Sequence, residues 1–237
     1  DPLFMKSLDV QGRTKIILDA CKKHNVNKII FISSGGAIYE GAKVIPTPED
    51  YPSHPVSLYG LANLMIEKYI EAYSKEYGLP YVILRLSNVY GPRQWKSGVI
   101  PSFVTNLLRR KTPVINGDGL QTIDFVYIAD VVGALLLALQ KNAGGLYNVA
   151  SGKEINLRGV FALTKKILNA PLAKPVYKIS EQRGSQRSVL DIKKIKRDLG
   201  WQPRIGFEKG LKETAKWFEV NHQVVQDWGL KSIKNLV

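Results

Sequence analysis

Residues 28–34 read Lys28-Ile29-Ile30-Phe31-Ile32-Ser33-Ser34, a short apolar run that ends in two small polar residues. A second run, Tyr81-Val82-Ile83-Leu84-Arg85-Leu86, continues into Ser87 and Asn88. Nearly continuous apolar runs of this length are typical of strands that are buried on both faces of a parallel sheet. We therefore predict two buried strands, each of which leads into a polar loop.

Helical patterns separate and follow these strands. Residues 59–77 have an amphipathic pattern that ends at Gly78 and Pro80. Further helical patterns cover residues 12–23, 99–110 and 128–140. Residues 35–56 contain Gly35-Gly36 and four prolines, and they are predicted to form a loop. Strands that alternate with helices predict right-handed βαβ units, and hence an α/β fold with a parallel sheet.

Three groups of polar side chains lie at or beside the predicted strand ends. They are Ser33-Ser34, Tyr59 and Ser87-Asn88. In parallel sheets, ligands bind beyond the carboxyl ends of the strands. Turn chemistry could explain any one of these groups, but their joint placement predicts a site.

Tyr59 and Asn63 lie four residues apart on one helical face, so their side chains can reach the same small volume. A free tyrosine has a pKa of about 10, and a nearby cation favours its ionised form. Asparagine can bind a ribose hydroxyl but supplies no charge. The pair is also compatible with an ordinary helix surface, so these two residues alone leave both interpretations open.

The composition indicates a basic globular protein. The 237 residues suffice for one large α/β domain or two small ones, and no apolar run is long enough to span a membrane. No signal peptide is recognised, and the single Cys21 excludes an internal disulfide, so we expect a cytoplasmic protein.

The net charge of +14 is distributed unevenly. Residues 1–150 hold 16 basic and 12 acidic residues, whereas residues 151–237 hold 18 and 8. This excess favours polyanionic partners such as nucleotides, anionic glycans or nucleic acid. Aromatic residues for base stacking do not cluster in residues 151–237, so nucleic acid is not the expected partner.

Several short motifs occur in the order found in one enzyme family. They are Phe31-Ile32-Ser33-Ser34 with Ile38-Tyr39, then Tyr59-Gly60, Arg85 to Gln94, Gly117 to Thr122, Asp124 to Tyr127, Tyr147-Asn148-Val149, and Leu199-Gly200-Trp201. The chain thus resembles the extended short-chain dehydrogenase/reductases, specifically the NAD-dependent sugar-nucleotide epimerase/dehydratase family, of which UDP-glucose 4-epimerase is a well-known member. The resemblance covers about residues 1–220.

The resemblance implies a role for each candidate residue. Tyr59 would take a proton from a sugar hydroxyl as hydride moves to NAD, with Ser34 as its catalytic neighbour. The implied contacts with NAD come from Ser33, Ser34, Tyr59, Asn63 and Asp9. The implied contacts with the nucleotide sugar come from Asn88, Val99, Pro101, Ile115 and Arg183, and Arg183 would pair with the pyrophosphate. No metal is implied.

The chain departs from the family pattern at specific positions. Asn63 replaces the lysine that activates the tyrosine, Ile123 replaces an arginine that contacts pyrophosphate, and Glu40 stands where glycine is usual. The glycine-rich turn that seats NAD would lie upstream of residue 1, so NAD binding by this chain is doubtful. Because general acid/base catalysis typically contributes about 10²–10⁴-fold, we expect an impaired or inactive site.

These observations lead to the following expectations. The fold is an incomplete, N-terminally truncated Rossmann-like parallel sheet that lacks its first βαβ unit, with a small C-terminal α/β portion that binds substrate. Residues 1–150 form the partial NAD-binding domain, residues 88–123 contribute partly to the substrate domain, and residues 151–237 supply most of it. The function is that of a nucleotide-sugar epimerase of the UDP-glucose 4-epimerase type, acting on a UDP-sugar as a homodimer. The alternatives are a nucleotide-sugar dehydratase or reductase, or a non-catalytic nucleotide-sugar- or RNA-binding protein.

Overall fold

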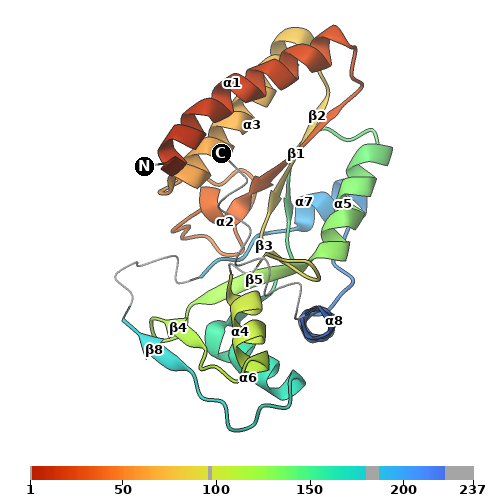
Figure 1. Ribbon diagram of the computed structural model, residues 1–237. Helices are drawn as coiled ribbons and strands as arrows, with labels where there is room; N and C mark the ends of the chain where they lie inside the picture. The colour runs from red at the N-terminus through yellow and green to blue at the C-terminus, as the bar shows by residue number, and fades with distance from the viewer. Residues whose placement is uncertain (1, 96–97, 180–186, 222–237) are drawn as a thin grey trace.

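Two packed α/β units make up the part of the chain that the computed structural model describes, residues 2–95, 98–179 and 187–221 (Figure 1). The first unit is built on a parallel sheet with strand order β1-β2-β6: β1 (Ile29–Ser34), β2 (Tyr81–Leu86) and β6 (Gly145–Val149). In this sheet Ser33 is the register partner of Arg85, and Arg85 is the partner of Asn148. The α/β class, the parallel sheet and the two strands predicted from the apolar runs are confirmed.

Helices cover both faces of this sheet. Helices α1 (Pro2–Lys23) and α3 (Leu58–Tyr77) pack on one face, where Leu18, Ile70 and Ile83 form a core. Helices α5 (Ile128–Gln140) and α7 (Lys193–Leu199) pack on the other face, against Val82 and Leu84. Alternate β2 residues therefore face opposite helix layers, and this alternation turns Arg85 toward α3.

The second unit contains the shorter strands, β3 (Asn88–Tyr90), β5 (Thr122–Tyr127) and β7 (Glu154–Asn156), in which β3 and β5 are parallel. Helices α4 (Val99–Leu108), α6 (Leu157–Ile167) and α8 (Phe207–Val220) enclose its core (Figure 1). A separate parallel pair joins β4 (Val114–Asn116) to β8 (Val176–Lys178). The chain crosses between the two units more than once, and the domain boundary at residue 150 stays a prediction.

Helix α3 begins and ends as its sequence predicts. The Ser57 hydroxyl accepts a hydrogen bond from the Gly60 amide at 3.1 Å, and Gly78 adopts the left-handed conformation that closes the helix. The segment predicted as a loop differs at its start, where Gly35–Ile38 form the short helix α2. Gly35 packs directly against Leu190, so this turn is fixed by a tertiary contact that local sequence does not reveal.

The two edges of the first sheet are treated differently. On β6, Lys194 Nζ donates to the Leu146 carbonyl at 2.7 Å, and the Asn148 amide donates to Glu49 Oε1 at 2.9 Å. At the opposite edge β1 pairs with β2 alone among the described residues, and Ile32 is exposed there.

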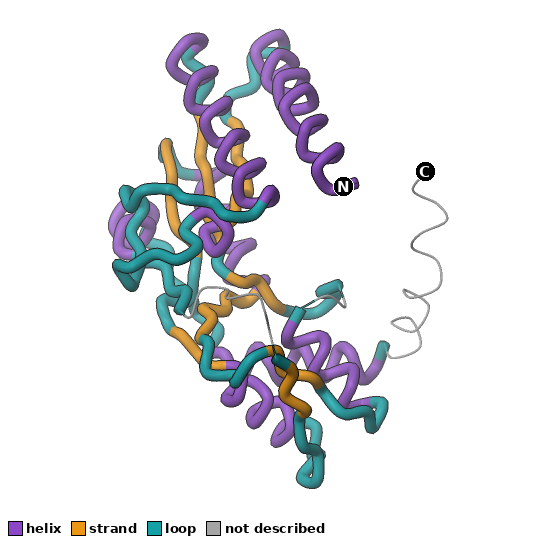
Figure 2. The backbone as a smooth tube through the Cα atoms, turned by 90° about the vertical axis from the view of Figure 1, so that its left-hand side faces the viewer, coloured by secondary structure: helices purple, strands orange, loops and turns teal. Residues whose placement is uncertain are grey.

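Figure 2 shows α1 and α3 side by side along this unit. No helix in the described residues has the length and apolarity needed to cross a membrane.

Candidate active site

A cavity of about 390 Å³ opens beyond the carboxyl ends of β1 and β2. Its lining includes Ser34, Glu40, Tyr59, Ser87, Asn88 and Ile123. The polar clusters that the sequence placed at strand ends thus meet in one hollow, with the exception of Ser33. Among the described residues that line this cavity there is no lysine, arginine or histidine.

Tyr59 lies in the first turn of α3, and its side chain is 65% exposed. The position of this turn is set by its neighbour Gly60, where an added Cβ would overlap the carbonyl oxygen of Ala37 in α2. Only glycine permits this approach of the two backbones. The packing of α3 on α2 therefore fixes where Tyr59 enters the cavity.

Asn63 is buried and does not line the cavity. Its amide nitrogen donates to the Tyr59 carbonyl oxygen at 2.8 Å, within the same helix. A side chain in this arrangement is satisfied by its own helix. A contact between Asn63 and a ribose hydroxyl, and with it the cofactor role expected for Asn63, stays a prediction.

The two serines at the end of β1 have different surroundings. Ser33 is buried, and its hydroxyl donates to Glu67 Oε1 at 2.5 Å. Ser34 lines the cavity beside Tyr59, and although it precedes α2 its side chain makes no capping hydrogen bond. Of the pair, only Ser34 lines the cavity, and the cofactor role expected for Ser33 stays a prediction.

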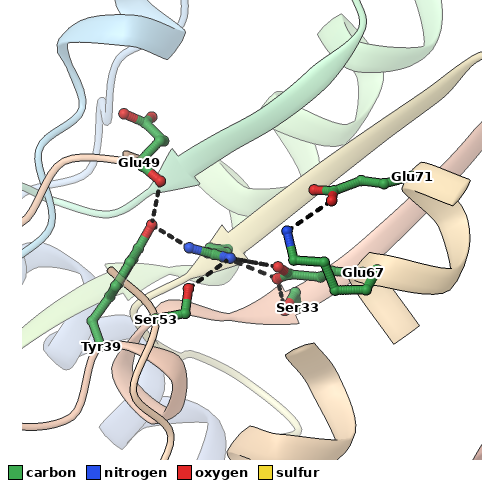
Figure 3. Close-up of polar contacts among 8 residues, drawn as sticks. Ser33, Tyr39, Glu49, Ser53, Glu67 and Glu71 are labelled. Carbon is green, nitrogen blue, oxygen red and sulfur yellow. Dashed lines mark hydrogen bonds and ion pairs between the residues drawn. The ribbon is translucent and has the colours of Figure 1, made fainter. Parts of the chain in front are cut away.

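A buried polar network joins β1, β2, α3 and the residues that follow α2, which are segments that also contribute residues to the cavity (Figure 3). Arg85 Nε contacts the two carboxylate oxygens of Glu67 at 3.0 and 3.2 Å, and Arg85 Nη2 lies 2.5 Å from Glu67 Oε2. Arg85 also donates to the Tyr39 hydroxyl, which in turn donates to the Glu49 carbonyl oxygen at 3.2 Å. Burial raises the pKa of Tyr39 to about 12, which keeps this hydroxyl a donor.

Sequence reasoning assigned no role to Arg85 or Glu67, although two signals were present. Arg85 interrupts an otherwise apolar strand, and a buried guanidinium requires a partner. Glu67 follows Tyr59 and Asn63 at a spacing of four residues, so it lies on the same face of α3.

A second buried carboxylate, Asp124, directly follows Ile123 and contacts Ser87, two residues that line the cavity. Asp124 accepts hydrogen bonds from the Ser151 amide at 2.8 Å, the Ser151 hydroxyl at 2.6 Å and the Gly152 amide at 3.0 Å. The Ser87 hydroxyl lies 3.5 Å from the same carboxylate. Burial raises the pKa of Asp124, although these hydrogen bonds oppose the shift.

The remaining candidate residues are spread over both units. Asn88 is exposed in the cavity, whereas Val99, Pro101 and Ile115 do not line it. Ile115 is 1% exposed within the core around α4. Asp9 lies in α1, and Arg183 lies outside the described residues. The nucleotide contacts stay predictions.

A larger hollow of about 760 Å³ lies at the far ends of α4 and α6. It is lined by residues such as Leu107, Arg110, Leu172 and Val176, and it contains none of the candidate residues. The volume of this hollow alone does not indicate a catalytic or binding function. The smaller cavity at the strand ends is the better candidate because it combines exposed hydroxyl, phenol and amide groups.

Comparison with known proteins gives a family match and a similar relative. The NAD dependent epimerase/dehydratase family matches residues 9–150. A protein from Methanocaldococcus jannaschii with the provisional name UDP-glucose 4-epimerase is 38% identical over 227 residues, which are 94% of this chain and 73% of that protein.

Two solved structures are similar in fold. The structure of the UDP-glucose 4-epimerase of Thermotoga maritima with UDP-glucose is 41% identical with a TM-score of 0.85, covering 88% of this chain and 69% of that one. The UDP-glucuronic acid 4-epimerase of Bacillus cereus in complex with UDP-glucuronic acid and NAD is 27% identical with a TM-score of 0.80, covering 87% and 66%. The Rossmann-like fold expected from the sequence is confirmed by these matches.

Proposed function

Because the chain belongs to the NAD dependent epimerase/dehydratase family, we propose that it binds a nucleotide sugar and carries the site of a 4-epimerase. The observation that carries this proposal is the convergence of Ser34, Tyr59 and Asn88 on one cavity. Three separate segments of the chain supply these residues, as expected of a built site rather than of turn chemistry. The resemblance in sequence to UDP-glucose 4-epimerases supports the epimerase over other members of the family.

The residues present suit the reactive end of NAD. Ser34 offers a hydroxyl that no cap uses, and the exposed phenol of Tyr59 stands in the same cavity. When bound, NAD would accept a hydride from the sugar and return it. For the rest of the cofactor the cavity is less suited, because its described lining supplies no cation for a phosphate and Asn63 is engaged within its helix.

In this proposal Tyr59 is the general base and later the general acid. In its ionised form, Tyr59 takes the proton of a sugar hydroxyl on its phenolate oxygen, and the phenol so formed gives the proton back after the sugar has turned over. Ser34 donates a hydrogen bond to the same hydroxyl oxygen, and Asn88 orients the sugar nucleotide. Since Asn63 supplies no charge to favour a phenolate, we expect turnover to be slow.

The test is binding first and turnover second. Isothermal titration with UDP-glucose measures whether the cavity takes a nucleotide sugar, with Tyr59→Phe and Ser34→Ala as site variants. Conversion of UDP-glucose to UDP-galactose is then followed with added NAD. Slow conversion that Tyr59→Phe abolishes supports the proposal, and binding without conversion makes the chain a nucleotide-sugar-binding protein. Absence of binding refutes the proposal.

We further propose that the chain forms a homodimer through α1 and α3. Ile16 and Ile17 on α1 are 69% and 56% exposed, and Leu61 and Tyr69 on α3 are also exposed. Apolar side chains gathered on neighbouring helices favour association. Light scattering of wild type and of an Ile16→Glu, Ile17→Glu variant tests this, and a wild-type monomer at micromolar concentration contradicts it.

A further inference from the structure

Glu40 introduces the one carboxylate among the described residues that line the candidate site. It directly follows Tyr39, the residue that ends α2 and that the buried network holds in place. The Glu40 residue is half-buried, and Tyr59 and Ser57 line the same hollow. Its position is therefore set by the same packing that positions the proposed acid/base.

The Glu40 carboxylate has no hydrogen-bond or ion-pair partner within the part of the chain that the structure describes. The buried carboxylates of the described residues are all engaged: Glu67 with Arg85, Asp124 with Ser151, and Asp130 with the backbone amides of Arg204 and Ile205. The charge of Glu40 is therefore available to act on a ligand that enters the cavity.

We propose that Glu40 selects the sugar by charge, so that the site disfavours sugars carrying a carboxylate and accepts neutral or amino sugars. This inference rests on the proposed function and specifies its substrate class. It concerns the sugar, because the sugar is the part of the ligand that must reach Tyr59.

The cavity is small enough for the charge of Glu40 to affect a ligand throughout it. The cavity has a volume of about 390 Å³, and the screening length at moderate ionic strength is about 8–10 Å. An anionic substituent anywhere in the cavity therefore experiences the charge of Glu40. Among the described lining residues no cation offsets this charge.

Two available ligands form a matched pair for the test. UDP-glucose and UDP-glucuronic acid share the nucleotide and the ring, and they differ at C6, which is a hydroxymethyl group in one and a carboxylate in the other. Binding of both to the full chain is measured by isothermal titration, and the ratio of the two dissociation constants is the readout. Effects of salt or substitution on the common UDP part cancel in this ratio.

The variants separate charge from shape. Glu40→Gln removes the charge with little change in size, Glu40→Asp retains the charge, and Asp50→Asn removes an exposed charge from the same loop outside the cavity. We expect the wild type to bind UDP-glucuronic acid about tenfold more weakly than UDP-glucose, with a smaller ratio at high salt. Glu40→Gln should bring the ratio below about threefold, whereas Glu40→Asp and Asp50→Asn should leave it near the wild-type value.

The outcomes distinguish this inference from the proposed function. Equal binding of the two ligands by the wild type overturns the selection by charge while leaving nucleotide-sugar binding intact. An undiminished ratio in Glu40→Gln also overturns it, because discrimination would then have another source. If neither UDP-sugar binds, the proposed function fails and this inference fails with it.

Discussion

Arg85 and Glu67 form an ion pair that is almost completely withdrawn from water, with the Arg85 side chain 3% exposed and the Glu67 side chain 0%. The pair joins β2 to α3, and Ser33 links it to the end of β1 (Figure 3). The pair and Ser33 thus tie together β1, β2 and α3, the elements whose ends line the cavity. Loss of either partner leaves the other charge buried and uncompensated.

Glu67→Gln is expected to lower the free energy of unfolding by about 3–5 kcal/mol, the usual cost of breaking a buried pair. Lys68→Ala, which removes the exposed pair with Glu71, should cost no more than about 1 kcal/mol. Urea unfolding followed by circular dichroism measures both. A similar decrease in the free energy of unfolding for both variants would show that the buried pair stabilises the protein no more than the exposed pair does.

Gly60→Ala should destabilise the protein by about 1–3 kcal/mol, because the new methyl group overlaps the Ala37 carbonyl and forces α3 away from α2. Gly12→Ala in α1 is the matched control, since an added Cβ there has open space around it. That substitution should stabilise the helix by about 0.5–1 kcal/mol. Thermal unfolding of the two variants should shift in opposite directions.

Asn63→Lys should lower the pKa of Tyr59, because a cation four residues away favours the phenolate. The change is measured as the phenolate absorbance that disappears when Tyr59→Phe is added in the same background. Leu61→Lys places a cation on a different face of α3 and serves as the control. An equal shift in both variants would indicate a general charge effect rather than a contact with Tyr59.

Asp124 should make stability depend on pH in the acid range. Burial raises the pKa of this carboxyl above its unfolded value of about 3.9, so the folded state holds the proton more tightly. The stabilisation of the folded state by proton binding at Asp124 is therefore fully present below the unfolded pKa. This stabilisation is lost as the pH rises through the folded pKa.

Asp124→Asn removes this dependence. As the pH falls from 7 toward 4, the free energy of unfolding of the wild type should improve relative to that of Asp124→Asn. Urea midpoints at a series of pH values give this difference directly. If the wild type instead becomes less stable than Asp124→Asn as the pH falls, the hydrogen bonds from Ser151 and Gly152 outweigh burial and lower the pKa of Asp124.

Continuous apolar runs and helical periodicity were sufficient for the parts of the fold that local sequence controls. The strands within residues 28–34 and 81–86 and the helix within residues 59–77 have clear patterns, and the structure has them. The three-residue strands β3 and β7 are too short for a periodicity to be read. They are defined by pairing with β5, which is a tertiary event.

The candidate site shows the same limit. Sequence position brought Ser34, Tyr59 and Asn88 to one region because parallel strands end at the same side of the sheet. It could not separate Ser33 from Ser34, since this difference depends on Glu67, which lies 34 residues further along the chain. It could not place Ile115 either, because an apolar side chain next to a predicted pocket suits the core equally well.

The treatment of the sheet edges has a consequence for how the protein can be extended. Lys194 and Glu49 occupy hydrogen-bonding groups that β6 turns outward, so a further strand cannot join there without displacing both side chains. Among the described residues, no side chain is found to occupy the outward hydrogen-bonding groups of β1 in this way. A strand added at this edge would lie beside the exposed Ile32. A further strand can therefore pair with β1, whereas the side chains at the β6 edge block pairing there.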